Sequence, residues 1–209
     1  MKYIKSIILF VVVSMVVVPS ALALGDEKLT SISYNMGVPT NDLKDFTGNT
    51  SYRGFGIQGR WFLKTGFSVG LAWEWQVFDF DTQEPLTTTA NLGSITIGGQ
   101  QYRYVNAFPF LATAHLYLGH PGSTRLFVGA GAGVYYMMER FEVGILALED
   151  NQWLFGGAPE AGVLAPVGDI YGHQNILLSA KYNYVFGKDN GIDFTWWEAQ
   201  IGITWNPEF

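Results

Sequence analysis

The feature that most constrains this chain of 209 residues is an alternation of bulky apolar side chains with small or polar ones. Between Phe67 and Val77 every odd position is aromatic or aliphatic, and every even position is Ser, Gly, Ala, Glu or Gln. A period of two places successive side chains on opposite faces of an extended strand. Eight such segments are present, covering residues 32–36, 55–61, 67–77, 108–118, 126–136, 153–163, 176–184 and 197–205. We therefore predict an all-β fold with an even number of strands.

Composition indicates which face of these strands is outside. Charged residues make up 14% of the chain, against about 25% in an ordinary soluble domain. The polar faces carry about one ionisable residue per strand and otherwise hold small or uncharged side chains, which would be a poor aqueous exterior. The bulky faces would in turn overfill the inside of an eight-stranded barrel. A soluble barrel of the lipocalin type is thus less consistent with the sequence than an antiparallel up-and-down transmembrane barrel with lipid outside.

The connections alternate in length in the way that such a barrel requires. Segments 63–66 and 119–124 are short and rich in turn residues, and segments 166–174 and 187–195 are intermediate. The long connections are segments 37–51, 79–104 and 139–152. Outer-membrane barrels have short periplasmic turns and long extracellular loops, so we expect the long segments on the extracellular side. Within the second one, residues 94–97 and 102–104 are expected to extend their hairpin beyond the membrane.

The first residues have the composition of an export signal. Lys2 and Lys5 precede an apolar run from Ile7 to Val18, and Ala21-Leu22-Ala23 follows. This pattern is typical of a secretory signal peptide spanning residues 1–23, with one barrel domain at residues 24–209. The alternative is a retained transmembrane helix, but the run is shorter than the ~20 residues that spanning needs. The predicted location is the outer membrane of a Gram-negative bacterium.

Composition also excludes several classes of function. The chain has no cysteine, so neither a disulfide scaffold nor a Cys-ligated metal site is expected. Its net charge of −6 argues against nucleic acid as a partner. His120 and His173 lie singly in predicted turns, and the glycines at 129–133 lack the spacing of a dinucleotide-binding loop. We expect no cofactor and no metal.

Charged side chains on the predicted inner faces form a candidate polar network: Arg60, Glu74, His115, Glu160, Lys181 and Glu198. A charge inside a barrel must be paired or hydrated, so the first interpretation is a set of salt bridges that holds the barrel closed. The alternative is a constricted ion pathway gated by the same pairs. A third interpretation takes Ser179, His115 and Glu160 as a hydrolytic triad, but all three are predicted to face the lumen rather than the lipid, so we predict no enzyme.

Tryptophans lie near both ends of the predicted strands. Trp61 and Trp205 fall near the short turns, and Trp75, Trp153 and Trp197 fall near the long loops. Aromatic girdles at both membrane interfaces are expected of a membrane barrel.

In its glycine-alanine run from Phe127 to Tyr135, its segment from Phe155 to Gly162 and its terminal Phe209, the chain resembles the small eight-stranded outer-membrane proteins. That group contains the OmpA transmembrane domain, OmpX and the opacity-type surface proteins. The resemblance implies that Phe209 is the end signal for the barrel-assembly machinery, although Pro207 and Glu208 depart from the usual pattern.

The function predicted from these features is structural or interactive, with long loops displayed at the cell surface. The alternatives are a narrow channel for ions or small solutes and, third, a lipid-modifying enzyme. The predicted partners are outer-membrane lipid, lipopolysaccharide, the assembly machinery and an extracellular ligand bound by the loops.

Overall fold

The fold is taken from a computed structural model, which describes residues 27–82, 86–90, 93–97, 101–143, 146–167, 174–189 and 192–206. The predicted signal peptide, His173 and Phe209 lie outside these residues. In the part of the chain that is described, no helix is both long and apolar enough to cross a membrane.

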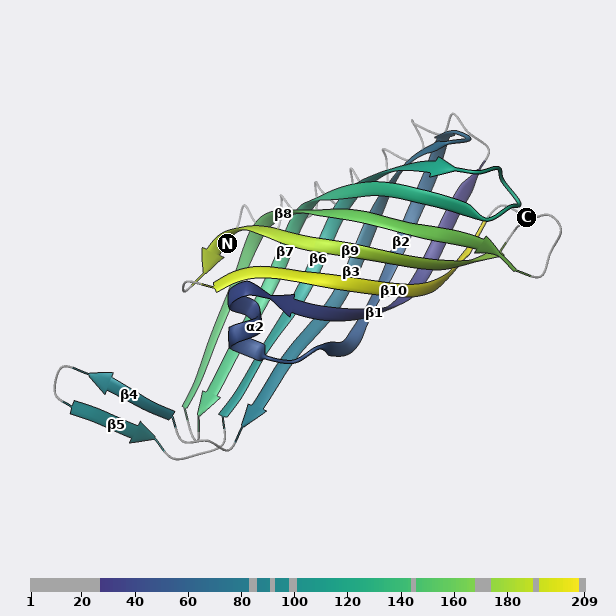
Figure 1. Ribbon diagram of the computed structural model, residues 1–209. Coiled ribbons are helices and arrows are strands. Elements are labelled where there is room, and N and C mark those ends of the chain that lie inside the picture. The colour runs from purple at the N-terminus through teal and green to yellow at the C-terminus, as the bar shows by residue number, and fades with distance from the viewer. Residues whose placement is uncertain are drawn as a thin grey trace.

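Eight antiparallel strands close into a barrel, as predicted (Figure 1). Around the ring the order is β1, β10, β9, β8, β7, β6, β3, β2, so each strand pairs with its neighbour along the chain apart from an inserted hairpin. The barrel strands are β1 (Lys28–Thr40), β2 (Ser51–Lys64), β3 (Phe67–Thr82), β6 (Gln101–Leu118), β7 (Arg125–Val143), β8 (Leu146–Pro166), β9 (Gln174–Asp189) and β10 (Ile192–Trp205).

The alternation of the sequence matches the two faces of these strands. On β6, for example, Leu116 and Leu118 are exposed on the outside, whereas Leu111, His115 and Tyr117 are buried inside. Val77 is an exception, because it was predicted to face lipid and is only 3% exposed. It lies at the end of the regular alternation of β3, where Gln76, Val77 and Phe78 are all buried.

The strands run further than the sequence suggested, which corrects the predicted loop boundaries. Residues 79–82, 139–143 and 146–152 were expected in loops but are strand. β8 has 21 residues, which at ~3.3 Å per residue and a tilt of ~40° is roughly 50 Å of height, against ~25 Å for the apolar band of a membrane barrel. Figure 1 shows β3, β6, β7 and β8 continuing past the rest of the barrel as a one-sided wall.

The second long loop also differs from the prediction. Residues 102–104 extend β6 against β3 as expected, but residues 94–97 do not continue that hairpin. They belong to β5 (Gly93–Ile97), which pairs with β4 (Leu86–Ala90) in a separate two-stranded sheet.

A short helix lies in the first long loop, where no helix was predicted. α2 (Asn41–Thr47) follows β1 directly and buries Leu43 and Thr47 completely. Two hydrogen bonds tie its start to β10: Asn41 Nδ2 donates to Thr195 Oγ1 (3.0 Å), and the backbone N–H of Asp193 donates to Asp42 Oδ2 (3.2 Å). The helix therefore covers the loop end of the barrel.

Apolar side chains fill both ends of the lumen. At the turn end, one buried cluster comprises Leu29, Phe62, Tyr117, Phe127, Leu164 and Leu177. At the loop end, a larger cluster gathers around Leu43 of α2 and includes Phe78, Val105, Leu111, Tyr135, Met137, Phe194 and Trp196. The polar side chains of the interior lie between these two clusters.

Candidate functional site

The structure places all six predicted network residues inside the barrel, each at most 5% exposed: Arg60, Glu74, His115, Glu160, Lys181 and Glu198. They come from six different strands, β2, β3, β6, β8, β9 and β10. Strand alternation alone turns them inward, because each has the same parity as the buried positions of its strand.

The ion pairs cross the lumen between strands that lie opposite each other. Arg60 Nη2 of β2 is 3.4 Å from Glu160 Oε1 of β8, and Lys181 Nζ of β9 pairs with Glu74 Oε1 of β3. In the ring of eight strands, both pairs join members four positions apart. An ion pair between opposite strands braces the barrel across its diameter.

A third ion pair crosses the barrel at the turn end, and sequence reasoning missed it. Arg125 at the start of β7 binds Glu27, just before β1, through two bonds: Nη2 to Oε1 (2.6 Å) and Nη1 to Oε2 (3.2 Å). Arg125 is 2% exposed and stacks over the rings of Phe62 and Tyr117. Its position beside a predicted turn gave no sign of burial. β7 and β1 are again opposite strands, so the three braces follow one another around the ring.

Neutral side chains also bind the charged groups of the interior network. Arg60 also donates to Tyr117 Oη (3.0 Å) and Gln58 Oε1 (2.7 Å), and its guanidinium lies 4.5 Å from the centre of the Phe127 ring. Glu160 Oε2 is hydrogen-bonded to His115 Nε2 at 3.1 Å. The central braces are thus held by hydrogen bonds as well as by charge, which a buried ion pair needs in order to be stable.

Glu198 is the surplus carboxylate of the network, because no described cation pairs with it. Its oxygens accept from three neutral groups: Asn183 Nδ2 (3.2 Å), Trp196 Nε1 (3.1 Å) and Gln200 Nε2 (2.7 Å). Gln200 Nε2 also donates to Glu74 Oε1 (3.1 Å). The amide of Gln200 therefore links the two carboxylates and is the donor to Glu198 Oε1, while Glu74 Oε1 also accepts from Lys181 Nζ.

The residues weighed as a triad do not assemble into one. His115 contacts Glu160, but Ser179 Oγ donates to Gln200 Oε1 (2.9 Å) instead of approaching the imidazole. A nucleophile must lie within hydrogen-bond reach of its base. Among the described residues, no group of three His, Asp or Glu side chains is arranged to hold a metal ion.

The predicted girdle tryptophans occupy the outer face near both ends of the strands. At the loop end, Trp75, Phe108, Tyr136 and Trp153 form a row across β3, β6, β7 and β8, with neighbouring ring centres 4.8–6.5 Å apart. Trp197 contacts Tyr182 on the adjacent strand β9 (4.8 Å). At the turn end, Trp61 and Trp205 lie near the ends of β2 and β10. The loop-end row and the two turn-end tryptophans thus lie at opposite ends of the apolar outer face, as expected for the two interfaces of a membrane barrel.

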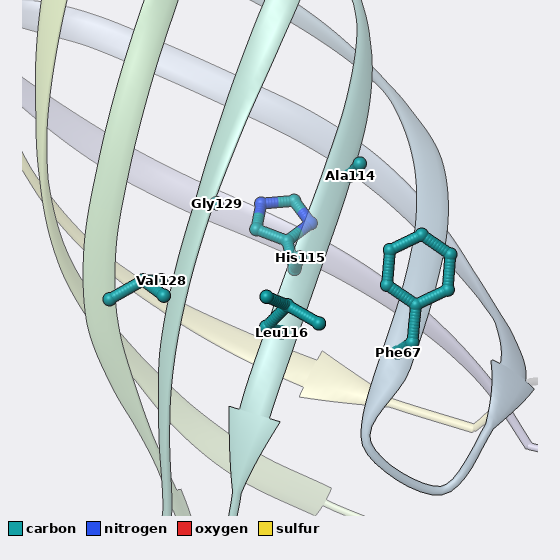
Figure 2. Close-up of a pocket in the computed structure, with 6 residues that line it drawn as sticks. All are labelled: Phe67, Ala114, His115, Leu116, Val128 and Gly129. Carbon is teal, nitrogen blue, oxygen red and sulfur yellow. The ribbon is translucent and has the colours of Figure 1, made fainter.

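An apolar hollow of about 320 Å³ opens between β3, β6 and β7 near the turn end (Figure 2). It is lined by Phe67, Ala114, His115, Leu116, Val128 and Gly129. Gly129 is required here, since a Cβ at that position would lie 2.3 Å from Cδ2 of His115. The exposed apolar side chains around it belong to the outer face, and we assign the hollow no function.

A closed ring of eight antiparallel strands with an apolar exterior and a charged interior is the fold of the small outer-membrane β-barrels. No family model matches the chain, and no curated protein matches its sequence. Among solved structures, Ail, the attachment invasion locus protein of Yersinia pestis, in complex with the heparin analogue sucrose octasulfate, is 14% identical with a TM-score of 0.53. The match covers 86% of this chain and 98% of Ail.

Two further structures match at lower TM-scores. Neisserial surface protein A is 13% identical with a TM-score of 0.48, over 86% of this chain and 95% of that one. The N-terminal β-barrel domain of Pseudomonas aeruginosa OprF is 15% identical with a TM-score of 0.46, over 85% and 96%. The likeness to Ail confirms the resemblance to small outer-membrane barrels at the level of the fold.

Proposed function

We propose that this protein is an integral outer-membrane barrel of a Gram-negative bacterium with a structural or interactive role at the cell surface. In this proposal residues 1–23 are removed on export, and residues 24–209 form the barrel. Its outer face contacts outer-membrane lipid and lipopolysaccharide. The barrel-assembly machinery inserts it by reading the end at Phe209. The apolar exterior between the loop-end aromatic row and the turn-end tryptophans Trp61 and Trp205 supports this placement.

The observation that carries the proposed role is the obstruction of the lumen. Three ion pairs cross it between opposite strands, and an apolar cluster fills it at each end. A conducting pathway would have to break buried ion pairs and displace well-packed aromatic rings, both at high cost in free energy. We therefore favour a surface role over a channel. The separation of Ser179 from His115 likewise favours a protein that is not an enzyme.

The loop end is the part of the molecule suited to an interaction. β3, β6, β7 and β8 form a wall that rises beyond the aromatic row, so in this orientation it stands above the outer leaflet. Ail was crystallised with a polyanionic heparin analogue. In this chain carboxylates are numerous at the loop end, on Asp42, Asp45, Asp79, Asp81, Glu142, Glu149 and Asp150. Their field opposes a polyanion, so we expect a different kind of ligand.

Surface labelling of single-cysteine variants tests the proposal, since the chain has no cysteine of its own. Ala147→Cys introduces an exposed thiol at the loop end and Thr124→Cys introduces one at the turn end. When intact cells are treated with a membrane-impermeant maleimide, we expect the label on the Ala147→Cys variant only. After the outer membrane is permeabilised, both variants should react.

Label on the Thr124→Cys variant alone in intact cells would reverse the orientation. Label on neither variant in intact cells, with both reacting after lysis, would show that the loop end is not at the cell surface. Either result would overturn the proposed role.

A further inference from the structure

A row of four side chains crosses the inner face of the loop-end wall. In the strand register, Phe80 of β3 lies opposite Arg103 of β6. Arg103 lies opposite Phe141 of β7, and Phe141 lies opposite Leu148 of β8. Each lies two residues beyond a position on the lumen side of its strand, as Phe80 does beyond buried Phe78. Phe46 of α2, whose ring centre lies 5.6 Å from Cζ of Arg103, joins this row to form one cluster at the loop end of the barrel. We call it the rim cup: Phe46, Phe80, Arg103, Phe141 and Leu148.

Three aromatic rings surround the Arg103 guanidinium. Its Cζ lies 5.2 Å from the centre of the Phe141 ring, 5.6 Å from that of Phe46 and 5.8 Å from that of Phe80. Such contacts stabilise the cation and fix the plane of its donors. Arg103 is half-buried, and Leu148 of the same cup is 69% exposed. The charge is therefore held in place at an accessible surface.

Arg103 differs from the other arginines in lacking an acidic partner among the described residues. Arg53, Arg60, Arg125 and Arg140 each lie within 4.0 Å of a carboxylate oxygen. Arg103 donates through Nη2 to the neutral Gln101 Oε1 (3.1 Å). Its Nε–H is buried without a hydrogen-bond partner, as are those of Arg60, Arg125 and Arg140. A guanidinium has five N–H donors in a planar fork that matches a carboxylate. The cup thus combines unused donors with an apolar wall.

We propose that the rim cup binds a small amphipathic molecule with a single carboxylate and an apolar body. The carboxylate would accept from the terminal Nη donors of Arg103, and the apolar body would lie along Phe141 and Leu148. One negative charge suits the site better than several, because Glu139 and Asp150 lie on the same face of β7 and β8 as Phe141 and Leu148, each two residues away from them. This inference rests on the proposed function, which places the cup on the outside of the cell.

The test uses the mature full-length protein in phosphatidylcholine nanodiscs, so it is independent of location in the cell. The probe is 4-butylbenzoate, compared with 4-butylbenzylammonium, which has a similar apolar body and the opposite charge. The readout is the ¹⁵N–¹H resonance of the Arg103 Nε group, with affinities measured by titration calorimetry against empty nanodiscs. We expect a saturable shift of this resonance with the benzoate alone.

Variants then assign the binding to the guanidinium. Arg103→Gln should weaken benzoate binding about tenfold or more, as expected for a lost hydrogen bond to a charged group. Arg103→Lys should recover only part of it, because an ammonium lacks the bidentate fork. Arg53→Gln, which removes an exposed arginine at the same end of the barrel, is the matched control and should bind as the unaltered protein does.

Several results would overturn the proposal. These are no saturable shift in the unaltered protein, equal binding of the ammonium probe, or unchanged affinity in Arg103→Gln. Tighter binding of sucrose octasulfate than of the benzoate would overturn the single-charge specificity. If Arg103→Gln does not fold, the titration of the unaltered protein still decides the matter. If surface labelling fails while the benzoate binds, the proposed function is wrong and the site stands.

Discussion

At the scale of single residues, the ion pair between Glu74 and Lys181 has the most direct consequence for stability. Both side chains are buried in the middle of the lumen, so Lys181→Met would leave the Glu74 carboxylate without its cation. We expect the free energy of unfolding to fall by about 3–5 kcal/mol, measured by urea titration in liposomes. Combining Lys181→Met with Glu74→Gln should restore much of it. A double variant no more stable than Lys181→Met would contradict this role.

Arg60 provides a second test, with an exposed arginine as its control. Arg60→Met removes the brace to Glu160 together with bonds to Tyr117 and Gln58, and should cost about 3 kcal/mol or more. Arg53→Met breaks an ion pair with Asp79 whose side chains are 63% and 55% exposed, so the loss should be at most about 1 kcal/mol. Equal losses in the same urea titration would show that Arg60 is not a brace.

The outer face is tested by a charge introduced at mid-height of a strand. Leu71 of β3 lies between Gly59 and Ala112 on the adjacent strands, within the apolar belt. Leu71→Arg should therefore reduce the free energy of unfolding in liposomes by about 2–4 kcal/mol. Tyr52→Arg, at a position 63% exposed near the loop end, should have little effect. A negligible effect of Leu71→Arg would mean that the faces are reversed.

The direction of each of these side chains was predictable from sequence, but its partner was not. Alternation alone turns Glu74 and Lys181 inward. Which strands lie opposite each other depends on ring closure and strand tilt, and no local pattern encodes either. The brace between Arg125 and Glu27 was missed for a related reason. Arg125 is the first residue of β7, where an arginine beside a turn usually faces water.

At the scale of elements, α2 is the clearest candidate for a cap on the lumen. Leu43 is completely buried against the loop-end cluster, whereas the neighbouring Lys44 is exposed. Leu43→Ala should lower the free energy of unfolding by about 2–5 kcal/mol. Lys44→Ala should change it by less than about 0.5 kcal/mol. Similar values for both variants in urea titration would show that the helix does not pack into the mouth.

The helical conformation of α2 was not predictable from its sequence. Seven residues are too few for a helical hydrophobic period or for stability in isolation, so tertiary packing of Leu43 and Phe46 determines that this segment is helical. The extensions of the strands were not predicted because their residues are polar. Glu139 to Glu142 and Glu149 to Asn151 are too polar to suggest strands, yet they pair in continuous register beyond the apolar belt.

At the scale of the whole molecule, the low charge content reflects two surfaces that water does not cover. One is the apolar outer face of the strands, and the other is a lumen filled by apolar clusters and paired charges. Eight strands and the identity of the two faces followed from sequence alternation, because the period of two is a local property. The one-sided wall and the rim cup required the structure, since they depend on unequal strand lengths.

The measurement that tests the central claim most directly is the conductance of the protein in a planar lipid bilayer. Because three ion pairs and two apolar clusters block the lumen, we predict no steady conductance, with insertion verified by the heat-modifiable mobility of the recovered protein. A steady conductance that Glu74→Gln or Lys181→Met altered would contradict a braced lumen. It would assign these residues to an ion pathway instead.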